Sequence, residues 1–114
     1  MSPDHRALVP VPASQGYNLK RIDMLMYAIR KGAHTELTFH HNEQYLTSFS
    51  LDFLEEKIKS PAFIRIHDRH LINLYYVNKF DSKNGRIIQM KDKRELEVSI
   101  ERLEAILELI GKSL

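Results

Sequence analysis

Most of this sequence consists of apolar segments of strand length, separated by short stretches rich in Gly, Asn, Asp, Ser and charged residues. Residues 63–67 (FIRIH) alternate between apolar and other side chains, a spacing typical of a half-buried β-strand. Residues 24–29 (MLMYAI) form a nearly continuous apolar run, although Met, Leu and Ala also favour helix. The other segments of this kind are residues 7–12, 17–22, 35–39, 44–49, 71–74, 75–77, 86–90 and 95–98. The pattern predicts a mainly β fold, with many short antiparallel strands around a modest core.

Proline and glycine indicate how some of these strands are placed. Pro10 and Pro12 interrupt the first segment. Because proline cannot donate to a strand ladder, that segment can only be an edge strand or an extended lead-in. Asn84-Gly85 is the strongest hairpin signal in the chain. Residues 86–90 and 95–98 are expected to follow it as paired strands.

Two segments have helical spacing. Ser50 is a candidate N-cap, and Pro61 ends the helix that follows it. The inward positions of this helix are Leu51, Leu54 and Ile58. After Ser99, apolar residues recur at spacings of three and four. They are Ile100, Leu103, Ile106, Leu107, Ile110 and Leu114. A wide face of this kind is most often core packing, with helix-mediated dimerisation as the alternative.

The chain of 114 residues is long enough for one domain, which we expect at residues 7–114, preceded by a flexible N-terminus at residues 1–6. It has no cysteine, which excludes disulfides, thiolate metal sites and a cysteine nucleophile. No apolar run approaches the ~18–20 residues needed to span a bilayer, and the N-terminus lacks the apolar core of a signal peptide. These features are compatible with a cytoplasmic protein that does not insert into membranes.

Positive charge is concentrated in one part of the chain. Residues 57–94 hold ten basic residues against three acidic ones, whereas the whole chain has a net charge of +2. A positive face formed by this segment would attract nucleic-acid phosphates through counterion release. The alternative is a solvated surface on which the charges scatter once the chain folds.

Enzymatic or metal chemistry finds little support in the sequence. The neighbours His40 and His41 point to opposite faces of a strand, and the spacing of His67 and His70 does not bring them together on a strand. A base and its orienting group must lie within hydrogen-bond reach, whereas the adjacent His67 and Asp68 diverge. The chain has no nucleophile elbow, glycine-rich phosphate loop or P-loop. We expect no metal site, no cofactor and no catalysis.

Residues 63–77 (FIRIHDRHLINLYYV) closely resemble the signature of the LytTR DNA-binding domain of bacterial transcriptional regulators. That signature has an aromatic residue, Arg, an apolar residue and His, then polar residues and an apolar–Asn pair. The flanks follow in the family's order: MLMYAIRKGAH, SLDFLEEKI, RIIQMKDKRELEV and a Val-Ser close. The resemblance covers about residues 7–109. Within the motif, Arg65, His67 and above all Asn73 have an alternative role in buried hydrogen bonding.

The resemblance implies an elongated stack of small antiparallel sheets, with about ten short strands, one short helix and a C-terminal helix. It also implies a transcriptional regulator that binds double-stranded DNA sequence-specifically, through loops that enter successive major grooves. Family members usually bind paired direct repeats, so a homodimer on DNA is expected. They usually carry a phosphorylatable receiver, so an upstream signalling partner is expected as well.

Carried over by position, the resemblance implies three loops that contact DNA. Their candidate residues are, in order, Lys31 and His34; Asp68, Arg69 and His70; and Glu101 and Arg102. Side chains suited to base edges are His34, Arg69 and Arg102. Phosphate contacts are expected from Lys31, Arg69, Lys83 and Arg102.

Two of these positions depart from the family pattern. Asp68 stands where Arg or Asn is common, and Ile100-Glu101 stands where a base-contacting Arg is common. Carboxylates repel phosphates unless they accept from cytosine or pair with an arginine. In the interpretation we favour, Arg69 and Arg102 take over the base contacts one position later. The alternatives are an altered sequence preference, or weakened DNA binding in a protein-interaction module on the same fold.

Overall fold

The computed structural model describes residues 8–81 and 86–112. Within them the chain forms ten β-strands, two α-helices and short 3-10 turns. The expectations for residues 1–6, Lys83, the Asn84-Gly85 turn and Leu114 concern positions outside the described residues.

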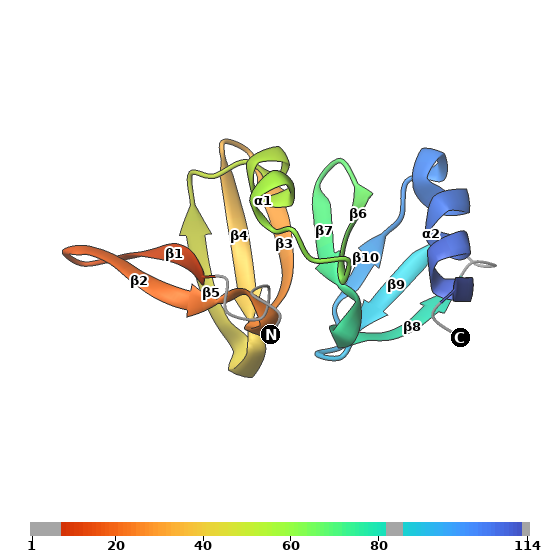
Figure 1. The fold of residues 1–114 in the computed structure, drawn as a ribbon, viewed down its shortest axis with the longest axis horizontal. Coiled ribbons are helices and arrows are strands. Elements are labelled where there is room, and N and C mark those ends of the chain that lie inside the picture. Colours follow the sequence, from red (N-terminus) through yellow and green to blue (C-terminus); the bar gives the residue numbers. More distant parts are fainter. Residues whose placement is uncertain (1–7, 82–85, 113–114) are drawn as a thin grey trace.

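The strands form three small antiparallel sheets (Figure 1). One sheet pairs β1 (Leu8–Ala13) with β2 (Gly16–Arg21). A five-stranded sheet has the order β5 (Glu43–Thr47), β4 (His34–Phe39), β3 (Leu25–Lys31), β7 (His70–Asn73) and β6 (Phe63–His67). A three-stranded sheet has the order β10 (Glu95–Glu97), β9 (Ile87–Met90) and β8 (Val77–Asp81).

The two helices complete the architecture. The short α1 (Leu51–Lys57) lies between β5 and β6 in the chain, and α2 (Ile100–Lys112) follows β10. The molecule measures 46 × 37 × 24 Å along its principal axes. These features confirm the predicted fold class, an elongated and mainly β stack of small sheets with one short helix and a C-terminal helix.

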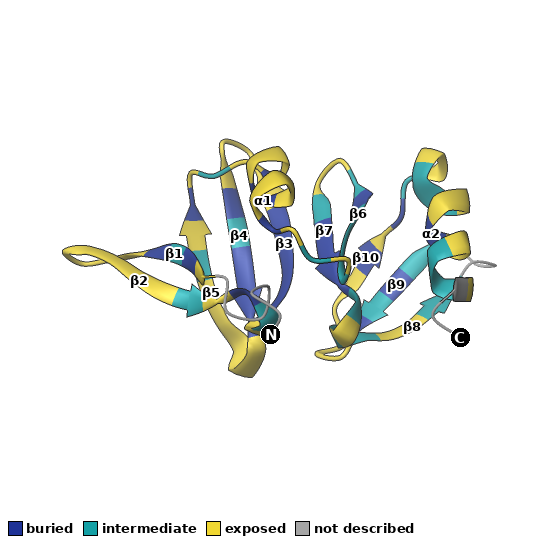
Figure 2. Ribbon diagram, viewed as in Figure 1, coloured by how far each residue is buried: buried dark blue, intermediate teal, exposed yellow. Residues whose placement is uncertain are grey.

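The burial of β3 explains the continuous apolar run in the sequence. Leu25 and Ala28 belong to one hydrophobic core, whereas Met26 and Ile29 belong to another. A bulge between Leu25 and Tyr27 shifts the register with β4 at this point. A strand that is buried on both faces does not alternate between apolar and polar residues. All five residues from Leu25 to Ile29 are buried, as the dark strand in Figure 2 shows.

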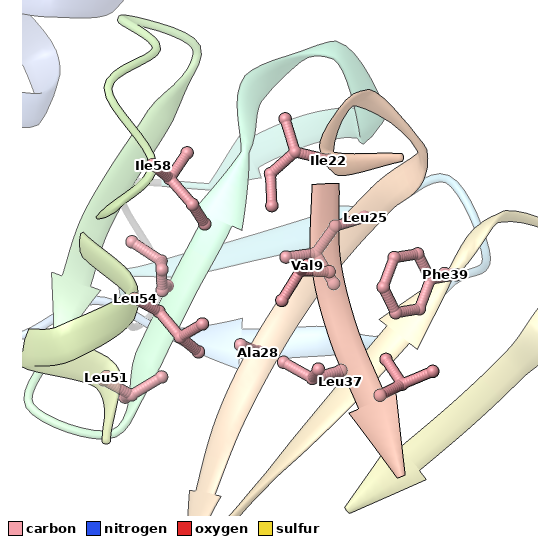
Figure 3. Close-up of a cluster of buried hydrophobic side chains, with 11 residues drawn as sticks. Val9, Ile22, Leu25, Ala28, Leu37, Phe39, Leu51, Leu54 and Ile58 are labelled. Carbon is pink, nitrogen blue, oxygen red and sulfur yellow. The ribbon is translucent and has the colours of Figure 1, made fainter. Parts of the chain in front are cut away.

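The first core lies where α1 and β1 cover one face of the five-stranded sheet (Figure 3). Val9 and Val11 are buried in it, while the alternating Pro10 and Pro12 are not. The prolines are tolerated because β1 belongs to a sheet of only two strands, which confirms the predicted edge strand.

The predicted start of the first helix is also confirmed. The Ser50 Oγ accepts a 3.0 Å hydrogen bond from the Phe53 backbone N–H, as expected for an N-cap. The three residues predicted to face inward are all buried, namely Leu51, Leu54 and Ile58. The helix ends earlier than predicted, at Lys57, and Ile58 is its extended C-cap residue.

The second core lies between the opposite face of the five-stranded sheet, the three-stranded sheet and α2. The prediction for α2 was wrong at two positions, because Ile100 and Leu107 are 67% and 45% exposed. Only Leu103, Ile106 and Ile110 pack against this core. The helix lies at one end of the molecule and is covered on one side only (Figure 1). The apolar stripe that it buries is therefore narrower than the apolar stripe in its sequence.

The segment after β7 differs from the predicted extended conformation. Leu74–Tyr76 form a 3-10 turn. The buried Asn73 causes this turn, because its Oδ1 accepts from the Tyr75 N–H at 3.1 Å while its Nδ2 donates to the Leu25 carbonyl at 3.0 Å. The buried hydrogen-bonding role expected for Asn73 is confirmed.

A side-chain hydrogen bond links the five-stranded sheet to the turn between β9 and β10 of the three-stranded sheet. The Tyr27 hydroxyl on β3 donates to the Asp92 carboxylate in the β9–β10 turn at 2.7 Å. Burial, together with this hydrogen bond, raises the pKa of Tyr27 to about 12. An unfolded tyrosine titrates near 10. The stabilisation from the protonated hydroxyl is therefore complete below pH 10 and is lost as the pH rises toward 12.

Tyr27→Phe is expected to lower the free energy of unfolding by about 1.5–3 kcal/mol at pH 7, the usual value of a hydrogen bond to a charged group. The variant is also expected to lose less stability than the parent between pH 10 and 12. Urea unfolding at pH 7, 10 and 11 measures both effects, with the 76% exposed Tyr75→Phe as the matched control. Parallel pH profiles for Tyr27→Phe and the parent chain would contradict this assignment.

Candidate nucleic-acid interface

Three connections of the chain lie along one long edge of the molecule, at the top of Figure 1. They are the β3–β4 turn, the β6–β7 turn and the junction of β10 with α2. The first two share this edge because β3 pairs antiparallel with both β4 and β7. Ile29 lies opposite His70, and the Arg30 N–H donates to the Arg69 carbonyl at 3.0 Å. The backbones of the two turns are therefore directly connected.

The first turn presents Lys31 and His34, which lie opposite each other in the β3–β4 ladder. Gly32 between them has φ +63°, a conformation that glycine adopts without strain. The Lys31 Nζ lies 3.3 Å from the Glu36 carboxylate, while His34 is exposed. The preceding Arg30 is also exposed and donates from Nε to the Gly32 carbonyl at 3.2 Å.

The second turn, Asp68-Arg69, holds its backbone rigidly and exposes the Arg69 side chain. The Arg69 N–H donates to the His67 Nδ1 at 3.0 Å, and the Arg69 carbonyl accepts from Arg30. Within the described residues, no carboxylate pairs with the Arg69 guanidinium. An exposed cation on a fixed backbone is well suited to a partner that arrives from solvent.

The Arg65 side chain stabilises this turn through hydrogen bonds, a role that we call bracing. Its guanidinium donates to the carbonyls of His67 and Asp68, at 2.9 and 2.6 Å. It also donates to Asp52 and Glu55 of α1, at 2.8 and 3.0 Å. These bonds hold the pKa of Asp52 below its usual range. The Arg65 side chain is only 10% exposed, so the buried structural role that the sequence left open for it is confirmed.

The two histidines of this hairpin correct an expectation. His67 and His70 were predicted to lie apart, but the two-residue turn between them places them opposite each other, with ring centroids 4.6 Å apart. The His70 Nδ1 is 2.9 Å from the Glu97 carbonyl, and burial lowers the pKa of His70. His70 is therefore partly held inside the sheet. In the described ranges, no three His, Cys, Asp or Glu side chains are arranged to hold a metal ion.

The third connection, between β10 and α2, is joined to the β6–β7 hairpin by a backbone hydrogen bond and an ion pair. The Ser99 N–H donates to the Ile66 carbonyl at 2.8 Å, which fixes the start of α2 beside β6. From the first turn of α2, the Arg102 Nη2 reaches to 3.7 Å from the Asp68 carboxylate. Glu101 is exposed beside it. Asp68 and Glu101 are the two carboxylates that depart from the family pattern, and the first of them thus has an arginine partner in Arg102.

The sequence-based site residues are therefore brought together, with Lys83 outside the described residues. Four cations lie at the three connections (Arg30, Lys31, Arg69 and Arg102), together with carboxylates that include Asp68, Glu101, the Glu36 that pairs with Lys31 and the Glu97 at the end of β10. The sequence interpretation missed Arg30 as a site residue. Its position beside Arg69 depends on the pairing of β3 with β7, for which the sequence carries no local signal.

A hollow of about 320 Å³ separates the first turn from α1. Arg30, His34 and Arg65 line it together with Asp52. The edge is thus not flat, and Arg30 and Arg65 contribute positive charge to this recess while Asp52 contributes a negative charge.

Comparison with known proteins gives three consistent results. The family model of the LytTr DNA-binding domain matches residues 16–111. Two heme-containing CO-sensing transcriptional regulators of Paraburkholderia xenovorans (strain LB400), RcoM 2 and RcoM 1, are 26% and 24% identical over 96% of this chain. The chain spans 42% and 43% of their lengths.

A solved LytTr DNA-binding domain from Bacillus cereus has the same fold, with a TM-score of 0.81 and 19% identity. The match covers 92% of this chain and 97% of that one. No helix within residues 8–81 and 86–112 has the length and apolar character needed to cross a membrane.

Proposed function

The chain belongs to the LytTR family of DNA-binding domains, and from that premise we propose that it binds duplex DNA sequence-specifically, as the DNA-reading part of a transcriptional regulator. The observation that carries the proposal is the alignment of three exposed connections along one edge, each with at least one cation. The longest dimension of 46 Å exceeds the ~34–36 Å helical repeat of DNA. The molecule as a whole, with the β1–β2 hairpin included, is therefore longer than one helical turn of DNA.

The side chains divide into two roles. Arg69 is the first candidate for a base contact, since a guanidinium can donate two hydrogen bonds to guanine. His34 and Arg102 are candidates at the neighbouring connections. Arg30 and Lys31 are placed for phosphates, which fix orientation without carrying sequence information. Lys83 keeps its proposed phosphate role from the sequence.

The contact between Asp68 and Arg102 supports the interpretation in which Arg69 and Arg102 make the base contacts, each one position later in the chain than in the family pattern. A carboxylate that is paired with a cation repels phosphate less than an isolated one. The same contact keeps the Arg102 guanidinium beside the second turn, 3.7 Å from the carboxylate. Asp68 in this proposal orients Arg102 and does not itself contact phosphate.

Asp68→Asn is expected to raise affinity for random duplex DNA about three- to ten-fold at low salt, because one negative charge leaves a surface that faces phosphates. The gain should shrink as the salt concentration rises. Fluorescence anisotropy with random and selected duplexes measures the change, and Glu95→Gln, at the exposed start of β10 next to the β9–β10 turn on the opposite edge, is the control. An unchanged affinity for both duplexes would mean that Asp68 lies away from the DNA.

The decisive experiment is selection from random duplexes, followed by a salt titration on the winning sequence. We expect an enriched motif and a linear fall of log affinity with log salt, because phosphate contacts release counterions. If no motif is enriched and the salt response is flat, the rival function gains, namely a protein-interaction module on the same fold.

Larger assemblies are part of the proposal. The relatives RcoM 1 and RcoM 2 are more than twice the length of this chain, and their names describe heme-containing CO sensors. We propose that this chain likewise acts with an upstream signalling partner, in the cytoplasm where the chromosome is accessible. It would bind direct repeats as two copies.

A further inference from the structure

An apolar groove and an apolar ridge lie in different halves of the molecule. The groove, of about 270 Å³, lies between α1 and the start of β1. Leu8 and Phe53 form its exposed rim, at 51% and 41% exposure, over a floor of buried residues such as Leu54 and Ile58. Its volume is below the ~300–1,000 Å³ typical of small-molecule sites. Side chains of a protein partner fit it better than a cofactor or metabolite does.

The ridge is the outer face of α2. Ile100 and Leu107 are exposed and lie two helical turns apart on the same side. Gly111 continues this side one turn further, and a side chain added there would meet nothing within 4 Å. The ridge is therefore accessible along its length, although it consists of residues that are usually buried.

The charges around the two surfaces are opposite. Among the described residues that line the groove, Lys57 is the charged one, and its Nζ lies 5.6 Å from the centre of the Phe53 ring. The ridge carries exposed carboxylates, Glu104 between Ile100 and Leu107 and Glu108 beside Leu107. An acidic apolar ridge thus complements a basic apolar groove on the same chain.

From this complementarity we propose that α2 of one copy docks into the groove between α1 and β1 of a second copy. Leu107 and Ile100 enter the groove, and Glu104 or Glu108 pairs with Lys57. Because ridge and groove are different surfaces, the contact is head-to-tail and leaves one groove and one ridge unfilled. Such a contact has no two-fold axis, whereas inverted DNA sites require one, so we propose that it serves sites repeated in direct orientation.

The contact is too small to hold a dimer in dilute solution. Two apolar side chains and one ion pair do not overcome the loss of translational and rotational freedom on association. Two adjacent sites on one duplex remove most of that cost, because they hold both copies at high effective concentration. We expect the second copy to bind on the order of ten-fold tighter than the first. This part of the inference rests on the proposed DNA-binding function.

The test uses the full chain and three duplexes that carry the selected site once, twice in direct orientation, or twice inverted. Cooperative binding is expected only on the direct repeat. Lys57→Glu and Glu104→Lys should each abolish it, and the double variant should restore it. Lys59→Glu, an exposed neighbour that does not line the groove, should keep it. Single-site affinity should be unchanged in all four. Equal cooperativity on both repeats, or no rescue in the double variant, would overturn the proposal.

A second measurement does not depend on DNA. In amide NMR spectra of the free chain from 0.05 to 1 mM, signals of α1, β1 and α2 should shift together with concentration, and less in Leu107→Asp. If groove signals move on deletion of residues 1–6 and not with concentration, the groove belongs to the chain's own N-terminus and the proposal fails. If the NMR shifts occur but no DNA is bound, the proposed function fails and the docking contact stands.

Discussion

Arg69→Ala is expected to weaken binding to the selected DNA site by about 1–3 kcal/mol, roughly 5- to 150-fold, because a bidentate arginine–guanine contact carries discrimination of that size. The stability of the protein should change little. Arg69 is exposed, and the two hydrogen bonds that fix this residue involve its backbone N–H and carbonyl, which alanine retains.

The measurement is a pair of anisotropy titrations, one with the selected duplex and one with random DNA. Arg94→Ala is the matched control, since Arg94 is an exposed arginine in the β9–β10 turn at the opposite edge (Figure 1). Equal losses on both duplexes would reduce Arg69 to a phosphate contact. A variant with the parent's affinity for both would remove Arg69 from the interface.

Arg65→Ala is expected to have the largest effect of any change near the interface, on both stability and DNA affinity. The side chain donates two charge-assisted bonds to the carbonyls of His67 and Asp68, and their loss should lower the free energy of unfolding by about 2–4 kcal/mol. The turn that presents Arg69 would then lose its brace. Affinity for the selected duplex should fall about ten-fold or more, although Arg65 itself is 10% exposed.

Two further variants separate bracing from charge. Arg65→Lys keeps the positive charge but cannot donate in the same fork, so it should restore little of the affinity. Asp52→Asn with Glu55→Gln removes the exposed carboxylate partners and leaves the bonds to the turn, so stability should change much less than in Arg65→Ala. Chemical denaturation at a temperature where all variants are folded gives the stabilities. A folded Arg65→Ala that retains the parent's DNA affinity would refute the bracing role.

How much of the fold could be predicted depends on how far apart in the chain the residues of each sequence pattern lie. The cap at Ser50 and the inward residues of α1 were predictable, because capping and helical periodicity involve residues three or four positions apart. The edge position of β1 followed from its prolines. The exposure of Ile100 and Leu107 was not predictable, because the periodicity of α2 does not show how much of its apolar face the sheet covers.

The candidate site likewise combines residues that the sequence indicated with positions that only strand pairing decided. The candidates in the three connections came from the family signature, but the mutual positions of those connections came from strand pairing. The approach of His67 to His70 depends on a two-residue turn that reverses the strand, where alternation along a single strand suggested separation. Arg30 became a site residue only because β3 and β7 are neighbours.

The sequence by itself indicated most of the strand segments, the two helices and the resemblance to the LytTR family, since these depend on residue types at short and regular spacings. Only the tertiary structure decided which side chains share the edge, that Arg65 donates to the carbonyls of the β6–β7 turn, and that Asp68 has a partner in Arg102. The physical reason is that these relations join residues far apart in the chain. Backbone pairing and packing between sheets position such residues, and no local pattern encodes that arrangement.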